Sequence, residues 1–465
     1  MVKKAAQFKD WLIKKRFFRT GWVAKDARAI SESEEALAAL PDDVADKLEQ
    51  AVNKLPTSSF EIQAILEPLE NAIAQWIEDP QSSNNSIVIL AQPVLPVSLV
   101  LAESLSRLNI KPKSPTIKLL DWVERPPYGN SIQKRLEEQL GDSNSDLPEE
   151  DQTKPDRITI LPNLCWCFLR SAQGLDGIDY LQSSIMNNNQ FVVIGCGQVG
   201  WEYLKSTLKF HAYCDQVIHL PKLTGKQLQK WIEPIVEQFD IQFTDTALHK
   251  RLGESNQLED MQLSIERPIE TLTEITQEAA ATAKSSLRSV KETLDGNVDN
   301  NVESASPKRE YFNRLADISD GVSIIAIQLF VRSLCYRKTA DSTEEGDVEG
   351  SAQQNEQEIR GAGRNFQKTS KTPQIIAQPP KLPPLPELSQ TDLYLLYSLM
   401  LHGDLTIGSL AESLGDAPQI VNNQVQLLRS EGIIEQKNGV IKTNPIHYPR
   451  LRRELSNNNF IIEVS

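Results

Sequence analysis

The fold is decided between residues 84 and 108, whose sequence is Asn-Asn-Ser-Ile-Val-Ile-Leu-Ala-Gln-Pro-Val-Leu-Pro-Val-Ser-Leu-Val-Leu-Ala-Glu-Ser-Leu-Ser-Arg-Leu. Residues 86–90 form a short apolar run with the length and β-branched composition of a buried parallel strand. After a tight turn, Leu99, Ala102 and Leu105 recur at helical spacing. Strand, turn and helix in this order are the setting of a phosphate-binding loop, so the sequence predicts an α/β domain with a P-loop-like parallel sheet.

The phosphate-binding pattern G-x-x-x-x-G-K-[ST] falls here on residues that lack its chemistry. Ala91 and Pro96 replace the two glycines, Val97 replaces the lysine, and Ser98 takes the hydroxyl position. Glycine lets consecutive backbone N–H groups point at a phosphate, whereas proline has no N–H group. Only Ser98 keeps a group that suits a metal ion. We therefore expect a retained scaffold with no bound cofactor and no catalysis.

Composition limits the class of protein. The chain has 465 residues, enough for more than one domain, and a formal net charge of −14, so non-specific binding to nucleic acid is not expected by default. Five cysteines, mostly within apolar runs, suit a reducing cytosol better than a disulfide framework. The five histidines are scattered, and we expect no metal site. No secretory signal or membrane-spanning run is visible, so we expect a cytoplasmic location.

The charge is concentrated at the N-terminus. Residues 1–28 hold nine Lys and Arg against two Asp, a net charge of +7 that leaves −21 for the remainder. Phe8, Trp11, Phe17 and Phe18 are interleaved with these charges. One interpretation is an anchor to a membrane surface or to nucleic acid. The other, which we favour, is a helix that packs its aromatic side chains on the domain behind it.

Five segments follow from composition and periodicity: a basic, aromatic segment at 1–30, an α/β domain at 31–235, a helical lid at 236–338, a disordered, Pro-rich linker at 339–386, and a last domain at 387–465. Helices are predicted at 34–40, 42–55 and from residue 59, and strands at 86–90, 116–120, 157–161, 191–195 and 216–220. The lid carries a polar insertion at 253–308, in which residues 265–294 keep the spacing of an amphipathic, partner-seeking helix. Residues 311–336 resume an apolar helical pattern.

The last domain has the pattern of a winged helix-turn-helix. Helices are predicted at 391–402, 406–414 and 418–430, with Gly415 ending the second. Asn438-Gly439 lies between two short apolar runs, which is the strongest short-range signal for a β-hairpin. Three helices and a two-stranded wing form this DNA-binding motif.

Residues 84–336 resemble the AAA-type ATPase module in their layout: a phosphate-loop strand and helix, an acidic-box strand, a sensor strand, a closing strand and a helical lid. Residues 210–232 are similar to the passage from the last strand into the lid, and residues 317–321 to the entry into the last lid helix. The winged helix after the lid is similar to those of the origin-recognition branch and to the MarR-like kind.

The resemblance implies catalytic positions that this sequence has replaced. Pro162 and Asn163 stand where the acidic box would hold Mg²⁺ and activate water. Gly195-Cys196-Gly197 replaces the polar sensor, and Ser323 and Ile324 stand near the position of the lid arginine. We therefore interpret the domain as a pseudo-ATPase, not an enzyme.

A second motif, G-x-G-x-x-G at residues 195–200, keeps a remote alternative open: an NAD(P)-dependent enzyme. The following strand ends in Leu220-Pro221-Lys222, without the expected acid, although Lys222 suits a 2′-phosphate. Residues 200–203 are also a poor start for a helix. We favour a structural turn.

The predicted recognition helix carries side chains of the types that contact base edges: Gln419, Asn422, Asn423, Gln426 and Arg429. Lys437 and Lys442 on the wing are predicted to contact phosphates, with Arg450, Arg452 and Arg453 behind them. Residues 388–465 nevertheless have six Lys and Arg against eight Asp and Glu, which is unfavourable for phosphate binding.

Two functions therefore stay open beside the remote enzyme. The first is a regulatory, DNA-associated adaptor of the transcription-regulator kind, with duplex DNA as its partner. The second is an assembly scaffold that uses residues 1–28 as a peripheral membrane anchor and residues 265–294 or the winged helix for protein docking.

Overall fold

The computed structural model describes residues 37–81, 83–108, 115–122, 124–141, 157–186, 190–243, 306–337 and 374–462. The chain forms two compact units, one of residues 1–242 with 312–465 and one of residues 243–311. The predictions for residues 1–28 and for the helix at 265–294 lie outside the described residues. In the second unit, the ring centroids of Phe243 and Tyr311 are 5.0 Å apart.

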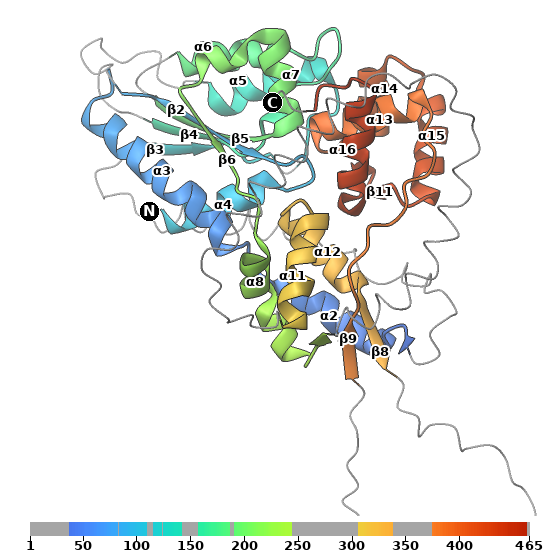
Figure 1. Cartoon of the computed structure of the whole chain (residues 1–465). Coiled ribbons are helices and arrows are strands. Elements are labelled where there is room, and N and C mark those ends of the chain that lie inside the picture. The colour runs from blue at the N-terminus through green and yellow to red at the C-terminus, as the bar shows by residue number, and fades with distance from the viewer. Residues whose placement is uncertain are drawn as a thin grey trace, which may run out of the picture. The chain divides into compact units, whose positions relative to one another are not determined.

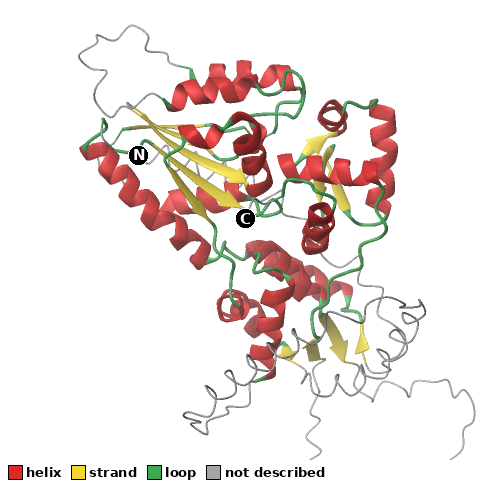
Figure 2. Ribbon diagram, turned by 45° about the horizontal axis from the view of Figure 1, so that its top comes forward, coloured by secondary structure: helices red, strands yellow, loops and turns green. Residues whose placement is uncertain are grey.

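A five-stranded parallel sheet forms the centre of the first unit. Its strands are β2 (Ser86–Ala91), β3 (Thr116–Leu119), β4 (Arg157–Leu161), β5 (Gln190–Gly197) and β6 (Gln216–His219). Their order is β3-β4-β5-β2-β6, so the strand of the phosphate-loop stretch is central. Ile87 pairs with Val193 on one side and with Gln216 on the other. The strands fan out with the usual twist (Figure 2).

Helices cover both faces of this sheet. Helices α3 and α4 lie on one side, and α5 and α6 lie on the other (Figure 1). The bounds are α3 (Ser59–Glu78), α4 (Val97–Arg107), α5 (Ile132–Leu140), α6 (Asp176–Ile185) and α7 (Gln198–Leu208), with 3-10 turns at Gly129–Ser131, Leu164–Trp166 and Phe210–Tyr213. All six residues of β2 are buried, which explains its continuous apolar sequence.

The lid follows the sheet. It contains α8 (Gly225–Gln238), α11 (Pro307–Ile318) and α12 (Ser323–Arg332), and α2 (Asp42–Lys54) lies close to α8. Strand β7 (Gln242–Phe243) follows α8. Thr224 and Gln227 form a capping box at the start of α8. Between α11 and α12 the backbone turns through Asp320 and Gly321, at φ angles of 53° and 66°.

A small antiparallel sheet corrects three predictions. β8 (Leu334–Arg337) pairs with β1 (Leu37–Ala38) and with β9 (Gln374–Ala377). The prediction of a helix at 34–40 is wrong at residues 37–38, and the predicted helical pattern of 311–336 ends at residue 332. The predicted disordered linker at 339–386 contains β9, where Ile376 is 1% exposed. Two- and four-residue strands are too short to show a period, and their pairing is set by distant partners.

The C-terminal domain has the predicted winged helix-turn-helix fold. Its elements are α13 (Gln390–His402), β10 (Leu405–Thr406), α14 (Ile407–Leu414), α15 (Pro418–Ser430), β11 (Ile434–Lys437), β12 (Val440–Thr443), a 3-10 turn at Pro445–His447 and α16 (Tyr448–Asn457). β12 lies between β10 and β11. Ser389 and Thr406 cap α13 and α14, and Gly415 ends α14 at a φ of 77°. The predicted fold class is therefore confirmed.

Candidate functional site

The loop between β2 and α4 lacks the continuous row of free N–H groups that a phosphate site needs. Pro93 and Pro96 carry no N–H group. The N–H of Leu95 donates to the Gln92 carbonyl at 2.8 Å, and the N–H of Val97 donates to the Leu95 carbonyl at 2.8 Å. A phosphate site needs backbone N–H groups that are not already bonded within the loop. These two N–H groups are therefore not available to a ligand.

Side chains at the positions of the phosphate-binding pattern pack in the hydrophobic core instead. Ala91 is 2% exposed and Val97 is 5% exposed, while Ser98 is half-buried. Val97, at the lysine position, lies against Gly195 of β5: a Cβ at Gly195 would be 3.4 Å from the Val97 Cγ2. The position that would supply a positive charge thus supplies apolar packing between β5 and α4.

The acidic-box position is also used for local structure. β4 ends at Leu161, and the Asn163 side chain accepts a hydrogen bond from the Cys165 N–H at 3.2 Å, which caps the 3-10 turn at Leu164–Trp166. Pro162 is buried, and its carbonyl oxygen would lie 2.5 Å from a Cβ at Gly195. Within the described residues, no group of His, Cys, Asp and Glu is placed to hold a metal ion.

The glycines of the G-x-G-x-x-G motif make room for protein atoms. β5 ends at Gly197, two residues beyond the predicted end of this strand, and α7 begins at Gln198. Residues 200–203 lie within α7, so the expectation that they are unsuited to a helix is wrong. A Cβ at Gly200 would lie 2.6 Å from the Cys165 Sγ and 2.9 Å from the Leu401 carbonyl oxygen. Leu401 belongs to α13 of the winged helix, so the start of α7, where a dinucleotide would bind, is covered by the C-terminal domain.

The winged helix is docked at the carboxyl end of the parallel sheet through a buried cluster around Arg125. Its guanidinium donates to the carbonyls of Cys165 at 2.8 Å and Asp404 at 3.3 Å, and also to that of Phe168. The Trp166 Nε1 donates to the Asp404 carboxylate at 2.6 Å. Burial lowers the pKa of Arg125 to about 10, so it stays charged at neutral pH. One cation thus joins the turn after β4 to the loop after α13.

His402, the last residue of α13, lies in the same cluster and is fully buried. Its Nε2 accepts a hydrogen bond from the Arg170 N–H at 3.3 Å, and its Nδ1 is 3.2 Å from the Arg125 Nη2. Its ring packs against Phe168, with centroids 4.9 Å apart. Burial and the positive charge of Arg125 hold the pKa of His402 well below its usual range. The imidazole is therefore neutral in the docked state.

Helix α14 adds a second group of contacts to the same interface. The Glu412 carboxylate accepts hydrogen bonds from the Gly129 N–H at 3.2 Å and the Ser171 hydroxyl at 2.8 Å. The Ser409 hydroxyl donates to the Pro127 carbonyl at 2.8 Å. The first helix of the helix-turn-helix is thus hydrogen-bonded to the α/β domain.

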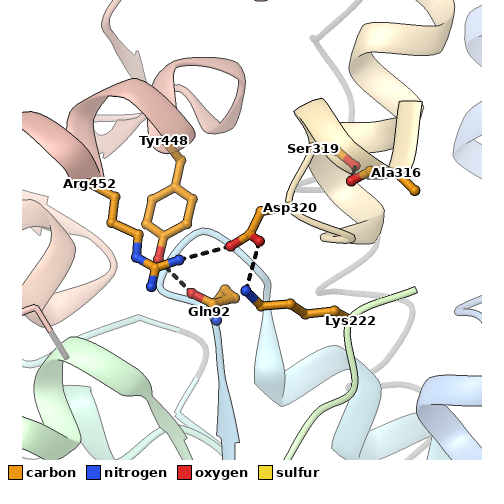
Figure 3. A network of polar contacts seen from close by, with 7 residues as sticks. All are labelled: Gln92, Lys222, Ala316, Ser319, Asp320, Tyr448 and Arg452. Carbon is orange, nitrogen blue, oxygen red and sulfur yellow. Dashed lines mark hydrogen bonds and ion pairs between the residues drawn. The ribbon is translucent and has the colours of Figure 1, made fainter. Parts of the chain in front are cut away.

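A third contact joins the loop, the lid and α16 (Figure 3). The Tyr448 hydroxyl donates to the Gln92 side-chain oxygen at 2.5 Å, directly on the degenerate loop. Asp320 binds Lys222 at 2.7 Å and Arg452 at 2.8 Å with its two carboxylate oxygens. Lys222, considered for a 2′-phosphate, and Arg452, considered for DNA phosphates, are therefore used within the protein.

The recognition helix α15 points its predicted contact residues away from the core. The exposed side chains are Gln419, Asn422, Asn423, Gln426 and Arg429. On the wing, Lys437 is exposed, whereas Lys442 lies 3.6 Å from the Asp404 carboxylate. The prediction that Lys442 serves DNA phosphates is weakened by this ion pair. Ile420 and Leu427 are also exposed on α15, at 55% and 65%.

Sequence reasoning missed the docking residues. Arg125 lies in a loop without a recognisable motif, and His402 is a lone histidine in an apolar helix. The only local signal was the apolar sequence of α13, in which nine of the thirteen residues are buried. A helix apolar on most of its surface packs on more than one side, which indicates an additional partner beyond the winged helix itself.

No protein-family model and no curated protein matches the sequence. Solved structures similar to this chain include the Aeropyrum pernix ORC2 protein in ADPNP-ADP complexes (11% identity, TM-score 0.34, 88% of this chain and 96% of that chain). Cdc6p from Pyrobaculum aerophilum (13%, 0.33, 91% and 100%) and the Thermotoga maritima RuvB Holliday junction branch migration motor (12%, 0.27, 86% and 98%) are also similar. The fold class is defined by the parallel sheet and the winged helix described above. No described helix is long and apolar enough to cross a membrane.

Proposed function

We propose that this protein is a non-catalytic AAA-like scaffold, a pseudo-ATPase that acts by binding a macromolecule through its winged helix. The observation that carries the proposal is the state of the former nucleotide loop: Pro93 and Pro96 have no N–H group, the N–H groups of Leu95 and Val97 are bonded within the loop, and Tyr448 of α16 contacts Gln92. A site filled by the protein's own groups does not favour nucleotide turnover. Helix α15, by contrast, is exposed and rich in side chains that can bind a partner.

Duplex DNA is the partner that the polar side chains of α15 suit best. Glutamine and asparagine can bind adenine with two hydrogen bonds, and arginine can bind guanine in the same way. Gln426, Asn422 and Arg429 are all exposed, with Lys437 exposed on the wing. The protein would thus act as a regulatory, DNA-associated adaptor.

Fluorescence anisotropy with labelled duplex DNA across a salt series tests this function in the full-length protein. We expect Arg429→Ala to weaken sequence-preferring binding by about 1–3 kcal/mol, because one bidentate base contact is lost. Arg135→Ala, at an exposed arginine of α5, is the matched control and should bind like the wild type. A chain lacking residues 1–28 tests whether the basic segment supplies the phosphate contacts.

Protein docking is the second candidate, and the exposed Ile420 and Leu427 favour it. These residues are seven apart and therefore share one face of α15. Asp416 and Glu431 are exposed just beyond the two ends of this helix, where they repel phosphates. Absence of DNA binding at low salt would contradict the DNA-associated function and assign α15 to a protein partner.

A further inference from the structure

The interface between the winged helix and the sheet contains a titratable group placed between two arginines. His402 approaches the Arg125 guanidinium with its Nδ1, at 3.2 Å, and the Arg170 backbone N–H with its Nε2, at 3.3 Å. A proton added to Nε2 would place two donors opposite each other. It would also put a second positive charge beside Arg125 in a region that excludes water.

The two carboxylates near this cluster, those of Asp404 and Glu412, already interact with Arg125 and with other groups of the protein. Arg125, Arg170 and the Cys165 backbone act on His402 directly. Around the two arginines lie Asp404, Glu412, Cys165 and Cys167, near Arg125, and Tyr203 and Tyr397, near Arg170. Asp404 already accepts from the Trp166 indole and lies 3.6 Å from Lys442. Glu412 accepts from Gly129 and Ser171. Burial raises the pKa of Cys167, Tyr203 and Tyr397, so these three side chains are neutral at neutral and acid pH. The pKa of Cys165, by contrast, is lowered, mainly by the hydrogen bond of its thiol with the Cys196 thiol.

We propose that His402 makes the docking of the winged helix acid-labile: its protonation releases the C-terminal domain from the carboxyl end of the sheet and uncovers the degenerate loop. The proposal is independent of which partner binds α15. It adds that the winged helix leaves its docked position when the pH falls and His402 is protonated.

The direction of the effect follows from proton linkage. In the docked state the pKa of His402 is depressed by burial and by Arg125, whereas a released His402 in water has a pKa of about 6.5. The released state therefore binds more protons at every pH between these values. The contribution of His402 to docking is fully present above about pH 6.5, and this one proton lowers the docking equilibrium constant by about tenfold per pH unit below that value.

Protonation of His447 is expected to change the docking equilibrium in the same direction as protonation of His402. His447 lies in the turn before α16, and burial with Arg332 and Arg450 lowers its pKa to about 4. Release of the winged helix would expose this imidazole too, so the wild-type protein can take up as many as two protons. A His402 variant is therefore expected to reduce the pH dependence by one proton and not to abolish it.

Hydrogen exchange measured by mass spectrometry at pH 7.5 and 5.5, with intrinsic rates corrected, tests the proposal in the full-length protein. We expect faster exchange at pH 5.5 in peptides around residues 125–131 and 164–171, and unchanged protection in β2. His402→Gln, whose side-chain oxygen can still accept from the Arg170 N–H, should reduce the pH-induced change about tenfold per pH unit below 6.5. His219→Asn, at an exposed histidine of β6, should behave like the wild type.

If His402→Gln does not dock at pH 7.5, the comparison of wild-type exchange at the two pH values still tests the proposal. Equal protection of the interface peptides at both pH values would overturn it. So would a His402→Gln protein that docks at pH 7.5 and retains the full wild-type response at pH 5.5. Loss of protection in β2 together with the interface would indicate global unfolding and would also contradict a local release.

Discussion

Gly200 of α7 packs directly against the Cys165 side chain and the backbone of α13. Any side chain there would meet the Cys165 Sγ at 2.6 Å and the Leu401 carbonyl at 2.9 Å. We expect Gly200→Ala to lower the stability of the protein by about 1–3 kcal/mol, the usual cost of overpacking a close contact. Gly408→Ala is the matched control, because its added Cβ would lie 3.9 Å from the nearest atom, on Thr406.

Urea denaturation followed by tryptophan fluorescence measures both variants. Alanine in place of glycine favours a helix by up to about 1 kcal/mol, so Gly408→Ala in α14 is expected to be neutral or stabilising. Gly200→Ala lies in α7 and gains the same helical preference, which makes any destabilisation attributable to the contact. An unchanged midpoint for Gly200→Ala would contradict the close packing of α13 on α7.

The loss of the residue types that nucleotide binding needs could be predicted from the sequence, but the residues that hold the C-terminal domain on the sheet could not. Val97 at the lysine position and Pro162 at the acidic box are visible in the sequence, because a motif assigns each position a required residue type. No pattern assigns a role to Arg125 or His402. Their partners are backbone carbonyls and N–H groups 40 to 279 residues away, and backbone groups leave no trace in the residue types.

Among the elements, those with their own start and stop signals were predicted accurately. Each of these helices begins at a capping residue of its own: Ser58 caps α3, Thr224 caps α8 and Ser389 caps α13. The short strands β1, β8 and β9 were not predicted. Each is defined by its partner in the sheet, and β9 lies in a segment whose composition is typical of a linker.

Strand β9 supports a stability prediction that separates a strand from a linker. Ile376 pairs with Cys335 and is 1% exposed, whereas Gln374, in the same strand, is exposed. We expect Ile376→Ala to lower the free energy of unfolding by about 2–5 kcal/mol, the usual range for a buried isoleucine. Gln374→Ala should change it by no more than about 0.5 kcal/mol. Thermal denaturation of the two variants tests this prediction. Equal melting temperatures would contradict a buried strand at residues 374–377 and indicate that they are part of the linker.

For the whole molecule, the main feature is a C-terminal domain that closes on the sheet where ligands of open α/β sheets usually bind. The contacts come from three places: Arg125 with Asp404, Glu412 with the loop at Gly129, and Tyr448 with Gln92. Sequence reasoning predicted both domains but placed no contact between them. Neither domain's own periodicity depends on the other, so their interface could be found only in the folded structure.

Isothermal titration of the full-length protein with ATP and Mg²⁺, followed by an assay of phosphate release, tests the central claim most directly. We predict no heat of binding and no phosphate release above the buffer, because two prolines and two internal hydrogen bonds interrupt the row of N–H groups in the loop, and the loop has no lysine. Measurable binding with hydrolysis that disappears in Ser98→Ala, while the folded structure of that variant is unchanged by circular dichroism, would show a working nucleotide site and contradict a scaffold that acts by binding alone.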